Sequence, residues 1–296
     1  MFIVLGKTGY IGSAFVQYLQ EHDIDHVALS RRDVDYTNEK IFKKYLQDGW
    51  KNTNHHFWKL QAGGIINCSG YIGKPNVDAC ELAKAETLIG NSNLPEKIAR
   101  ICGEMNVPFI HISSGCIYGG YDKDFSENDP PNFDFQNGSF YSGSKALAER
   151  LIAATNKDSY IFRLRIPFDE HNSPRNYITK MLSYDKLLNA VNSMSHRKDF
   201  VTACVELAMS KSPYGIYNLT NPGRVDTKTV IDMIKKHQPD LRESFTFYED
   251  EDTFLGDVTA PRSNCVLDTS KMEAVLGAKK MRPLEAALEE SIINYS

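Results

Sequence analysis

The sequence predicts an α/β fold, a Rossmann-type doubly wound parallel sheet followed by a smaller C-terminal lobe. Short apolar runs alternate with longer segments of helical period through the first half of the chain. This alternation is typical of buried parallel strands in βαβ units. A glycine-rich turn directly follows the first apolar run and opens the first helical segment, which is the strand–turn–helix order that begins such a sheet.

Five apolar runs are expected to form the strands of this sheet: FIVL, HVALS, GIINCS, PFIHIS and YIFRLR. The helical segments expected beside them are residues 10–21, 38–46, 76–105 and 140–154. The segment 121–138 is rich in Asp, Asn, Pro and Gly. We therefore expect it to form a surface loop beside the carboxyl edge of the sheet.

The alternation becomes less regular after Pro167. Here we expect strands at GIYNLTN and FTFY and helices over residues 227–237 and 284–294. We therefore assign residues 1–166 to the Rossmann domain, with a contribution from about 190–222, and residues 167–296 mainly to the smaller lobe.

Bulk composition argues against several classes of protein. The net charge of -4 gives no general electrostatic reason to bind nucleic acid or an anionic membrane. The start, MFIVLGKTGYIG, has no basic region, and its apolar run is too short for a signal peptide or a membrane span, so we expect a cytoplasmic protein. The six cysteines include no CxxC pair or zinc-ligand spacing, so we expect neither disulfides nor a metal.

The glycine-rich turn has the spacing GxxGxxG: Gly6, Lys7, Thr8, Gly9, Tyr10, Ile11 and Gly12. Such glycines let the backbone turn tightly and approach a pyrophosphate at the helix N-terminus, where N–H groups and the helix dipole favour an anion. The second apolar run ends in Ser30, Arg31 and Arg32, where NAD-preferring enzymes usually place an acidic residue. Two guanidiniums suit a 2′-phosphate, so the sequence predicts NADPH rather than NADH.

Tyr141 and Lys145 form a YxxxK pair one turn apart on the same face of a predicted helix. A nearby ammonium is expected to lower the pKa of the phenol, which can then donate a proton to a carbonyl oxygen as hydride arrives. Ser114 ends the PFIHIS strand, which brings its hydroxyl to the same carboxyl edge, where it can bond the reacting oxygen.

The glycine turn, the strand-end serine and YxxxK, in this order, resemble the extended short-chain dehydrogenase/reductase family across nearly the whole chain. The resemblance implies that Ser114, Tyr141 and Lys145 are the catalytic set and that Asn91 supports the active site. It also implies cofactor contacts for the adenine-proximal Asp35 and for Asn67, Cys68, Ser69 and Gly70.

Further passages resemble the subfamily of epimerase/reductases that complete UDP-L-rhamnose in plants: GKPNVD, SSGCIY, SPRNYITK, NLTNPG and APRSN. The implied substrate is a UDP- or dTDP-4-keto-6-deoxy-hexose that is inverted at carbons 3 and 5 and then reduced at carbon 4. The related GDP-fucose synthases share SSxCIY and use its cysteine, which implies that Cys116 is the epimerisation base. Lys180 matches the subfamily at NxITK and is our candidate acid, with His171 as the alternative.

The resemblance also assigns the sugar nucleotide to the C-terminal lobe. The candidate substrate-binding residues are Lys74, Asn76, Arg175, Asn176 and Arg262. Arginine suits a diphosphate because it makes charge-assisted bonds to phosphate oxygens. The family further implies a homodimer formed through the helix that carries YxxxK, with no nucleic-acid or membrane partner.

Two other functions stay open at the level of sequence. One is a monofunctional dTDP-4-dehydrorhamnose reductase, although such enzymes generally lack a cysteine at the Cys116 position. The other is a non-catalytic, cofactor-binding regulatory subunit like that of methionine adenosyltransferase, against which the intact Ser, Tyr and Lys argue. Two features depart from the plant pattern: residues 167–174 are shorter, and Gly143 lowers the helix propensity within YxxxK.

Overall fold

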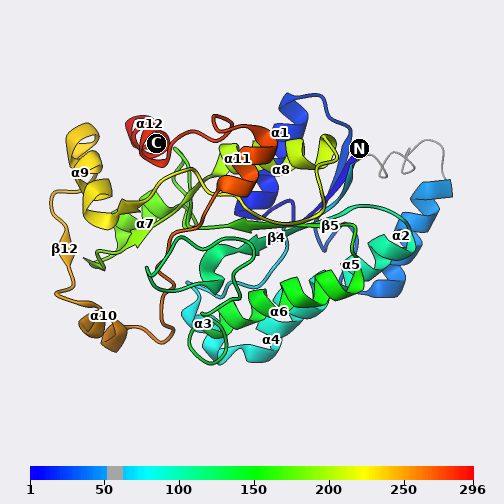
Figure 1. The fold of residues 1–296 in the computed structure, drawn as a ribbon, viewed down its shortest axis with the longest axis horizontal. Helices are drawn as coiled ribbons and strands as arrows, with labels where there is room; N and C mark the ends of the chain where they lie inside the picture. The colour runs from blue at the N-terminus through cyan, green and yellow to red at the C-terminus, as the bar shows by residue number, and fades with distance from the viewer. Residues whose placement is uncertain (52–62) are drawn as a thin grey trace.

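A computed structural model describes residues 1–51 and 63–296, and a six-stranded parallel sheet forms its centre (Figure 1). Its strands are β1 (Phe2–Leu5), β2 (His26–Leu29), β3 (Gly64–Asn67), β4 (Phe109–Ser114), β5 (Ser159–Leu164) and β10 (Gly215–Asn218). They lie in the order β2-β1-β3-β4-β5-β10, which places a topological switch point between β1 and β3. The predicted Rossmann-type fold is confirmed.

The central strands are buried on both faces, which explains their continuous apolar sequences. Every residue of β1, β3 and β4 is buried. Because helices cover both faces of a parallel sheet, such strands need apolar residues at successive positions rather than at alternate ones. The five strands predicted in the first half are therefore confirmed.

Helices pack on both faces of the sheet. On one face, α1 (Tyr10–Glu21), α8 (Arg197–Met209) and α11 (Ser270–Leu276) share a core through Phe15, Phe200 and Met272. On the other, α2 (Glu39–Lys51), α5 (Leu94–Glu104) and α6 (Phe140–Thr155) share a second core. In Figure 1 these two layers lie above and below the sheet.

The predicted helical stretch 76–105 is not one helix. It consists of α3 (Asp78–Leu82), α4 (Lys84–Leu88), a π-helical turn (Ile89–Asn93) and α5. The backbone of Ala83 is not helical, with φ -112° and ψ 57°, and this separates α3 from α4. The π-helical turn places Asn91 against α6, where it supports the candidate site described below.

The chain leaves the sheet after β5 and later returns to it. α8 packs on α1, and β10 then pairs in parallel with β5, so that Tyr217 lies opposite Phe162. Residues far beyond Pro167 therefore complete the sheet. None of the helices in the described ranges is both long and apolar enough to cross a bilayer.

The smaller lobe lies beyond the carboxyl edge of the sheet, on the left in Figure 1. It contains α7 (Tyr177–Ser183), α9 (Thr227–His237), α10 (Glu251–Asp257) and α12 (Leu284–Ile293). Its own core includes Phe168, Ile178, Ile231 and Leu288. Short strand pairs complete it: β6 (Pro167–Phe168) with β9 (Ser195–His196), β8 (Val191–Asn192) with β11 (Val225–Asp226), and β7 (Lys186–Leu187) with β12 (Thr246–Phe247).

Candidate active site

A cavity of about 1420 Å³ lies between the carboxyl edge of the sheet and the smaller lobe. It brings together many of the residues that the sequence singles out: Thr8, Gly9, Tyr10, Ile11, Cys68, Ser69, Gly70, Lys74, Asn76, Asn91, Ser114, Cys116, Tyr141, Lys145, His171, Arg175, Lys180 and Arg262. The remaining candidates do not line it: Gly6, Lys7, Gly12, Ser30, Arg31, Arg32, Asp35, Asn67 and Asn176.

The glycine turn shapes one end of the cavity. Gly6 has φ +84°, a left-handed conformation, and a Cβ on Gly12 would lie 2.1 Å from the Gly6 carbonyl oxygen. α1 begins after Gly9 without a side-chain cap, so no side chain of the helix competes for its first N–H groups. An uncapped helix N-terminus at the cavity wall fits the pyrophosphate of a dinucleotide.

Arg197 of α8 holds this turn in place, and the sequence motifs gave no sign of it. Its Nε donates to the Tyr10 carbonyl at 2.7 Å, one Nη donates to the Ser13 hydroxyl at 2.7 Å, and the other pairs with Asp169 at 2.9 Å. The guanidinium also lies 4.6 Å from the centre of the Tyr10 ring. Arg197 thereby ties the glycine turn to the start of the smaller lobe.

The end of β2 carries an acidic group that the sequence reading did not expect there. Asp33 accepts hydrogen bonds from the N–H and hydroxyl of Ser30, both at 2.7 Å, and pairs with Lys7 at 2.9 Å. The hydrogen bonds from Ser30, together with Lys7, hold the pKa of Asp33 below its usual range. Arg31 and Arg32 are exposed beside this cluster, outside the cavity.

Asp35 shapes the same surface turn. Its carboxylate accepts hydrogen bonds from the hydroxyl of Thr37 at 2.5 Å and from the Thr37 N–H at 3.1 Å. These bonds, led by the hydroxyl, lower the pKa of Asp35. Its carboxylate therefore stabilises the turn after β2, and any contact with an adenine would be made from this exposed turn.

The N-terminus of α6 fixes the position of YxxxK. The Ser139 hydroxyl caps the helix by accepting the Ser142 N–H at 3.1 Å, and the Phe140 N–H donates to Glu81 at 2.6 Å. The helix therefore begins at Phe140 and presents Tyr141 in its first turn. Asn91 braces the next turn, because its side-chain amide donates to the Ser144 hydroxyl at 3.1 Å.

Burial sets the protonation of Tyr141. It raises the pKa of the phenol, as does the neighbouring Cys116, while the Ser114 hydroxyl and then the Arg175 guanidinium act in the opposite direction. The pKa of Tyr141 is therefore raised overall, contrary to the expectation that a nearby ammonium lowers it. A phenol that keeps its proton at neutral pH is suited to donate it to a ketone oxygen.

Lys145 points toward β4. Its Nζ donates to the Ile112 carbonyl at 2.8 Å and lies 3.3 Å from Nε2 of the buried His111. Burial lowers the pKa of Lys145 to about 8, although Glu149 acts in the opposite direction. The amine is therefore close to its titration midpoint at mildly alkaline pH.

The lowered pKa of Lys145 predicts a fall in the reaction rate at alkaline pH, the alkaline limb of the pH–rate profile. If the Lys145 ammonium is required, kcat/KM for NADPH falls tenfold per pH unit above about 8, because the lowered pKa removes the charge there instead of near 10.5. The measurement is a pH profile of initial rates between pH 6 and 10. The residual activity of Lys145→Arg should lack this limb, and an unchanged limb in that variant would contradict the assignment.

Asn67 does not reach the cavity. It is fully buried, its Oδ1 accepts the Ser69 N–H at 3.1 Å, and its Nδ2 lies 3.3 Å from Nδ1 of His111. Burial, followed by the charge of Lys145, places the pKa of His111 well below its usual value. Asn67 therefore positions the loop that follows β3, and the cofactor contact that the resemblance implies for it stays a prediction.

Gly143 lies against the Phe135 ring, which gives a packing reason for the glycine inside YxxxK. A Cβ at this position would lie 2.4 Å from the Phe135 ring, which comes from the loop before α6 and packs against Phe140 with ring centres 5.1 Å apart. The loop is thereby clamped to the helix that carries Tyr141.

We expect Gly143→Ala to lower the free energy of unfolding by about 1–3 kcal/mol, because the new methyl group overpacks against Phe135. Phe135→Ala should relieve this clash, so the double variant loses less stability than the sum of the two single variants. Urea unfolding of the three variants measures this coupling. Strict additivity would show that Phe135 is not the obstacle.

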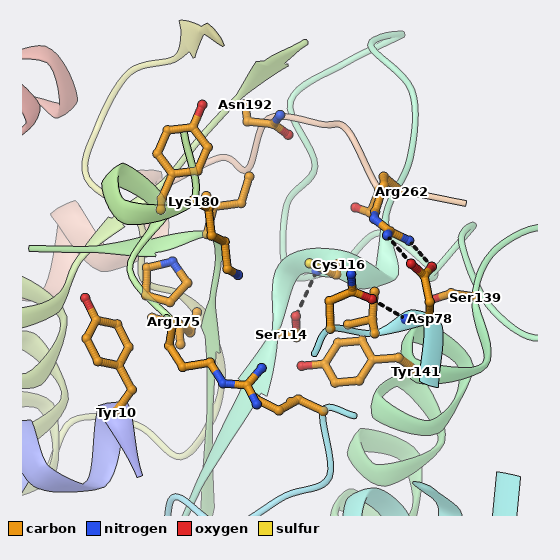
Figure 2. Close-up of a pocket in the computed structure, with 18 of the residues that line it drawn as sticks. Tyr10, Asp78, Ser114, Cys116, Ser139, Tyr141, Arg175, Lys180, Asn192 and Arg262 are labelled. Atoms are coloured by element: carbon orange, nitrogen blue, oxygen red, sulfur yellow. Dashed lines mark hydrogen bonds and ion pairs between the residues drawn. The ribbon is translucent and has the colours of Figure 1, made fainter. Parts of the chain in front are cut away.

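Cys116 and Lys180 face each other across the cavity. The Cys116 N–H donates to the Ser114 hydroxyl at 3.1 Å, which holds the thiol in the 3-10 turn Gly115–Ile117 that follows β4. Figure 2 shows the Lys180 amine and the Tyr141 phenol pointing into the space beside Cys116 and Ser114. Burial and then Arg175 lower the pKa of Lys180, while the nearby Cys116 sulfur acts in the opposite direction.

His171, the alternative acid, is in a different environment. Its side chain is 60% exposed, and its ring lies 3.8 Å from the Glu170 carboxylate. The Lys180 amine points into the space beside Cys116 in Figure 2, whereas the ring of His171, which also lines the cavity, is mostly exposed and lies beside Glu170. The geometry therefore favours Lys180 as the partner of Cys116.

Two arginines of the smaller lobe reach across the cavity to the loop after β3. Arg262 forms a two-pronged ion pair with Asp78 at 2.8 and 2.9 Å, which Figure 2 shows, and Arg175 donates to the Gly73 carbonyl at 3.2 Å. In Figure 2 the Arg175 guanidinium lies between Tyr10 and Tyr141. Arg175 therefore remains a candidate ligand of an anion, while Arg262 already has a carboxylate partner.

The other polar candidates differ in position. Lys74 is exposed at the rim of the cavity, and Asn76 accepts the Asp78 N–H at 2.9 Å. Asn176 is fully buried outside the cavity: its Oδ1 caps α7 by accepting the Ile178 N–H at 3.0 Å, and its Nδ2 donates to the carbonyls of Asp169 and His171. The amide of Asn176 is therefore used within the fold, and the substrate contact that the resemblance implies for it stays a prediction.

Comparisons with known proteins identify relatives of this chain. A bifunctional dTDP-4-dehydrorhamnose 3,5-epimerase/dTDP-4-dehydrorhamnose reductase of Arabidopsis thaliana is 31% identical over 306 residues, which cover 99% of this chain and 91% of the relative. A trifunctional UDP-glucose 4,6-dehydratase/UDP-4-keto-6-deoxy-D-glucose 3,5-epimerase/UDP-4-keto-L-rhamnose-reductase of the same organism is 31% identical over 305 residues. Those 305 residues cover 100% of this chain and 41% of that relative.

Solved structures agree with the sequence comparisons. A UDP-rhamnose synthase of Acanthamoeba polyphaga mimivirus superimposes with a TM-score of 0.86 and 25% identity, covering 99% of this chain and 98% of that one. The model of the RmlD substrate binding domain matches residues 1–296. From the glycine turn to the terminal helix, the chain thus belongs to the RmlD substrate binding domain family.

Proposed function

We propose that this protein is a bifunctional 3,5-epimerase/4-reductase that converts UDP-4-keto-6-deoxy-D-glucose into UDP-L-rhamnose with NADPH. The observation that carries the proposal is the convergence of two reactive pairs on one cavity. Ser114 and Tyr141 form a pair suited to reduction, and Cys116 and Lys180 form a base and an acid on facing walls. The names of the plant and viral relatives support a nucleotide-linked rhamnose or its 4-keto precursor, with UDP in two of the names and dTDP in the third.

Epimerisation needs only the chain's own residues. The ketone at carbon 4 acidifies the protons on carbons 3 and 5, and the Cys116 thiolate takes one of them. The Ser114 and Tyr141 hydroxyls stabilise the enolate oxygen, and Lys180 returns a proton to the opposite face of the carbon. The thiol then loses its proton to water and the amine regains one, so each inversion consumes no redox equivalent.

Reduction follows at the ketone carbon. The nicotinamide, when bound, supplies hydride to this carbon. Tyr141 donates its proton to the ketone oxygen, and Ser114 holds that oxygen during the transfer. The raised pKa of Tyr141 keeps the phenol protonated for this step.

Arg31 and Arg32 are proposed to select NADPH through its 2′-phosphate. The double variant Arg31→Ala/Arg32→Ala should raise KM for NADPH about tenfold or more, because the 2′-phosphate loses its charge-assisted bonds at this exposed site, while KM for NADH changes little. Steady-state kinetics with both cofactors measure this difference. Lys40→Ala, which removes an exposed cation from α2, is the matched control. Equal losses for both cofactors would contradict selection by these arginines.

Product analysis tests the whole proposal. Purified protein is incubated with UDP-4-keto-6-deoxy-D-glucose and NADPH in deuterium oxide, and the product is identified by NMR. We expect UDP-L-rhamnose that carries deuterium at carbons 3 and 5. Reduction without deuterium uptake would show that the protein is a monofunctional reductase. Turnover of the dTDP sugar alone would show that the substrate carries dTDP in place of UDP. Absence of turnover with both sugars would contradict the proposal.

A further inference from the structure

Two arginines at the end of β5 have contrasting environments. Arg163 and Arg165 are both 1% exposed. Arg163 faces the Glu149 carboxylate, with nitrogen–oxygen distances of 2.8 and 3.1 Å. Within residues 1–51 and 63–296, no carboxylate lies within ion-pair distance of Arg165. A buried cation without an anionic partner is costly, so Arg165 calls for a specific explanation.

Apart from the Cys116 sulfur, the hydrogen-bond acceptors of Arg165 among the described residues are neutral oxygens. Its guanidinium donates to the Gly115 carbonyl at 3.3 Å, to the Ser263 hydroxyl and carbonyl at 2.9 and 2.8 Å, and to the Asn192 side-chain oxygen. Its Nε is buried and has no hydrogen-bond partner. These contacts fix the guanidinium in place but leave its charge uncompensated.

The Cys116 sulfur is the group beside Arg165 that can supply the missing charge. One guanidinium nitrogen lies 3.8 Å from it, and Cys116 is a partly exposed residue that lines the cavity. Cys265 and Tyr121 also face Arg165, but burial raises the pKa of both groups. They therefore keep their protons at neutral pH, which leaves Cys116.

We propose that Arg165 is the positioning counter-ion of a Cys116 thiolate. The thiolate would lie between the guanidinium behind it and the Lys180 amine across the cavity. The Tyr141 phenol and the buried Cys265 thiol are further titratable neighbours. The proton of the thiol leaves to water through the cavity, and the charge of Arg165 compensates the sulfur anion. This inference rests on the proposed function for the use of the thiolate as a base, whereas its existence is a separate property of the protein.

Alkylation kinetics test this proposal without any sugar substrate. The rate at which iodoacetamide modifies Cys116 is measured from pH 5 to 10 by mass spectrometry of the peptide that contains it, since the thiolate is the reactive form. For the protein without substitutions, we expect the midpoint of the alkylation rate against pH to lie at least one pH unit below the value of about 8.5 for a free thiol. Arg165→Met should raise this midpoint by one unit or more and slow alkylation at pH 7 about tenfold.

Arg165→Lys is the matched variant, because it keeps a positive charge and should retain most of the low midpoint. Circular dichroism and NADPH binding verify that each variant is folded. If Arg165→Met does not fold, a second measurement still decides whether the anion exists at neutral pH. It compares the thiolate absorbance at 240 nm of the protein without substitutions with that of Cys116→Ser. A midpoint near 8.5 in the protein without substitutions would overturn the proposal. So would a folded Arg165→Met variant with the same midpoint as that protein.

The outcomes separate this inference from the proposed function. A low midpoint without deuterium uptake at the sugar would uphold the ion pair and reject epimerisation. Deuterium uptake with an ordinary midpoint would uphold epimerisation and reject the role of Arg165.

Discussion

Tyr141→Phe is expected to lower kcat for reduction by roughly 10³-fold, because a phenylalanine has no proton to give to the ketone oxygen. The cofactor should still bind, since the glycine turn and the start of α1 are unaffected by the loss of one oxygen atom. NADPH consumption with pre-epimerised keto sugar measures the first effect, and NADPH fluorescence titration measures the second.

The loss should be specific to this phenol. Tyr121 lies outside the cavity, and its phenol donates to the Val191 carbonyl at 3.0 Å, so Tyr121→Phe is a matched control that should keep full activity. Turnover by Tyr141→Phe at the rate of this control would contradict the assignment of the proton donor.

Cys116→Ala is expected to separate the two reactions. Without the thiolate, deuterium uptake at carbons 3 and 5 should fall by roughly 10²-fold or more, because proton abstraction loses its general base. Reduction of pre-epimerised substrate should stay within a few-fold, since Ser114 and Tyr141 are retained. NMR of the sugar in deuterium oxide follows the uptake, and NADPH absorbance follows the reduction.

Cys102→Ala is the control for this variant, because Cys102 is buried in α5 within the core on one face of the sheet. It should retain both activities. Undiminished deuterium uptake in Cys116→Ala would show that another residue is the base and would remove the epimerase half of the proposed function.

The features that the sequence predicts correctly are local ones. FIVL, the glycine turn and the helix at Phe140 each follow from neighbouring residues: apolar runs long enough to be buried on both faces, glycines where a Cβ would clash, and a serine cap. The positions of Ser114 and Tyr141 at one edge then follow from the direction of parallel strands.

What the sequence misses depends on tertiary contacts. Arg165 lies in an apolar strand sequence, and only the folded chain shows that Arg163 meets Glu149 while Arg165 meets neutral groups and a thiol. The resemblance implies ligand contacts for Asn67 and Asn176, and only the structure shows that both amides hold the backbone. The position of Asn176 just before a helical segment is typical of an N-cap, a signal that could have identified its role.

A crystal structure with NADP⁺ and UDP-L-rhamnose tests most directly the claim that epimerisation and reduction take place in one cavity. The account predicts that carbon 4 of the sugar faces the nicotinamide, with its oxygen within hydrogen-bond distance of Tyr141 and Ser114, and that the Cys116 sulfur and the Lys180 amine lie on opposite faces of the ring. A sugar bound with its ring turned away from the Cys116 sulfur would contradict the account.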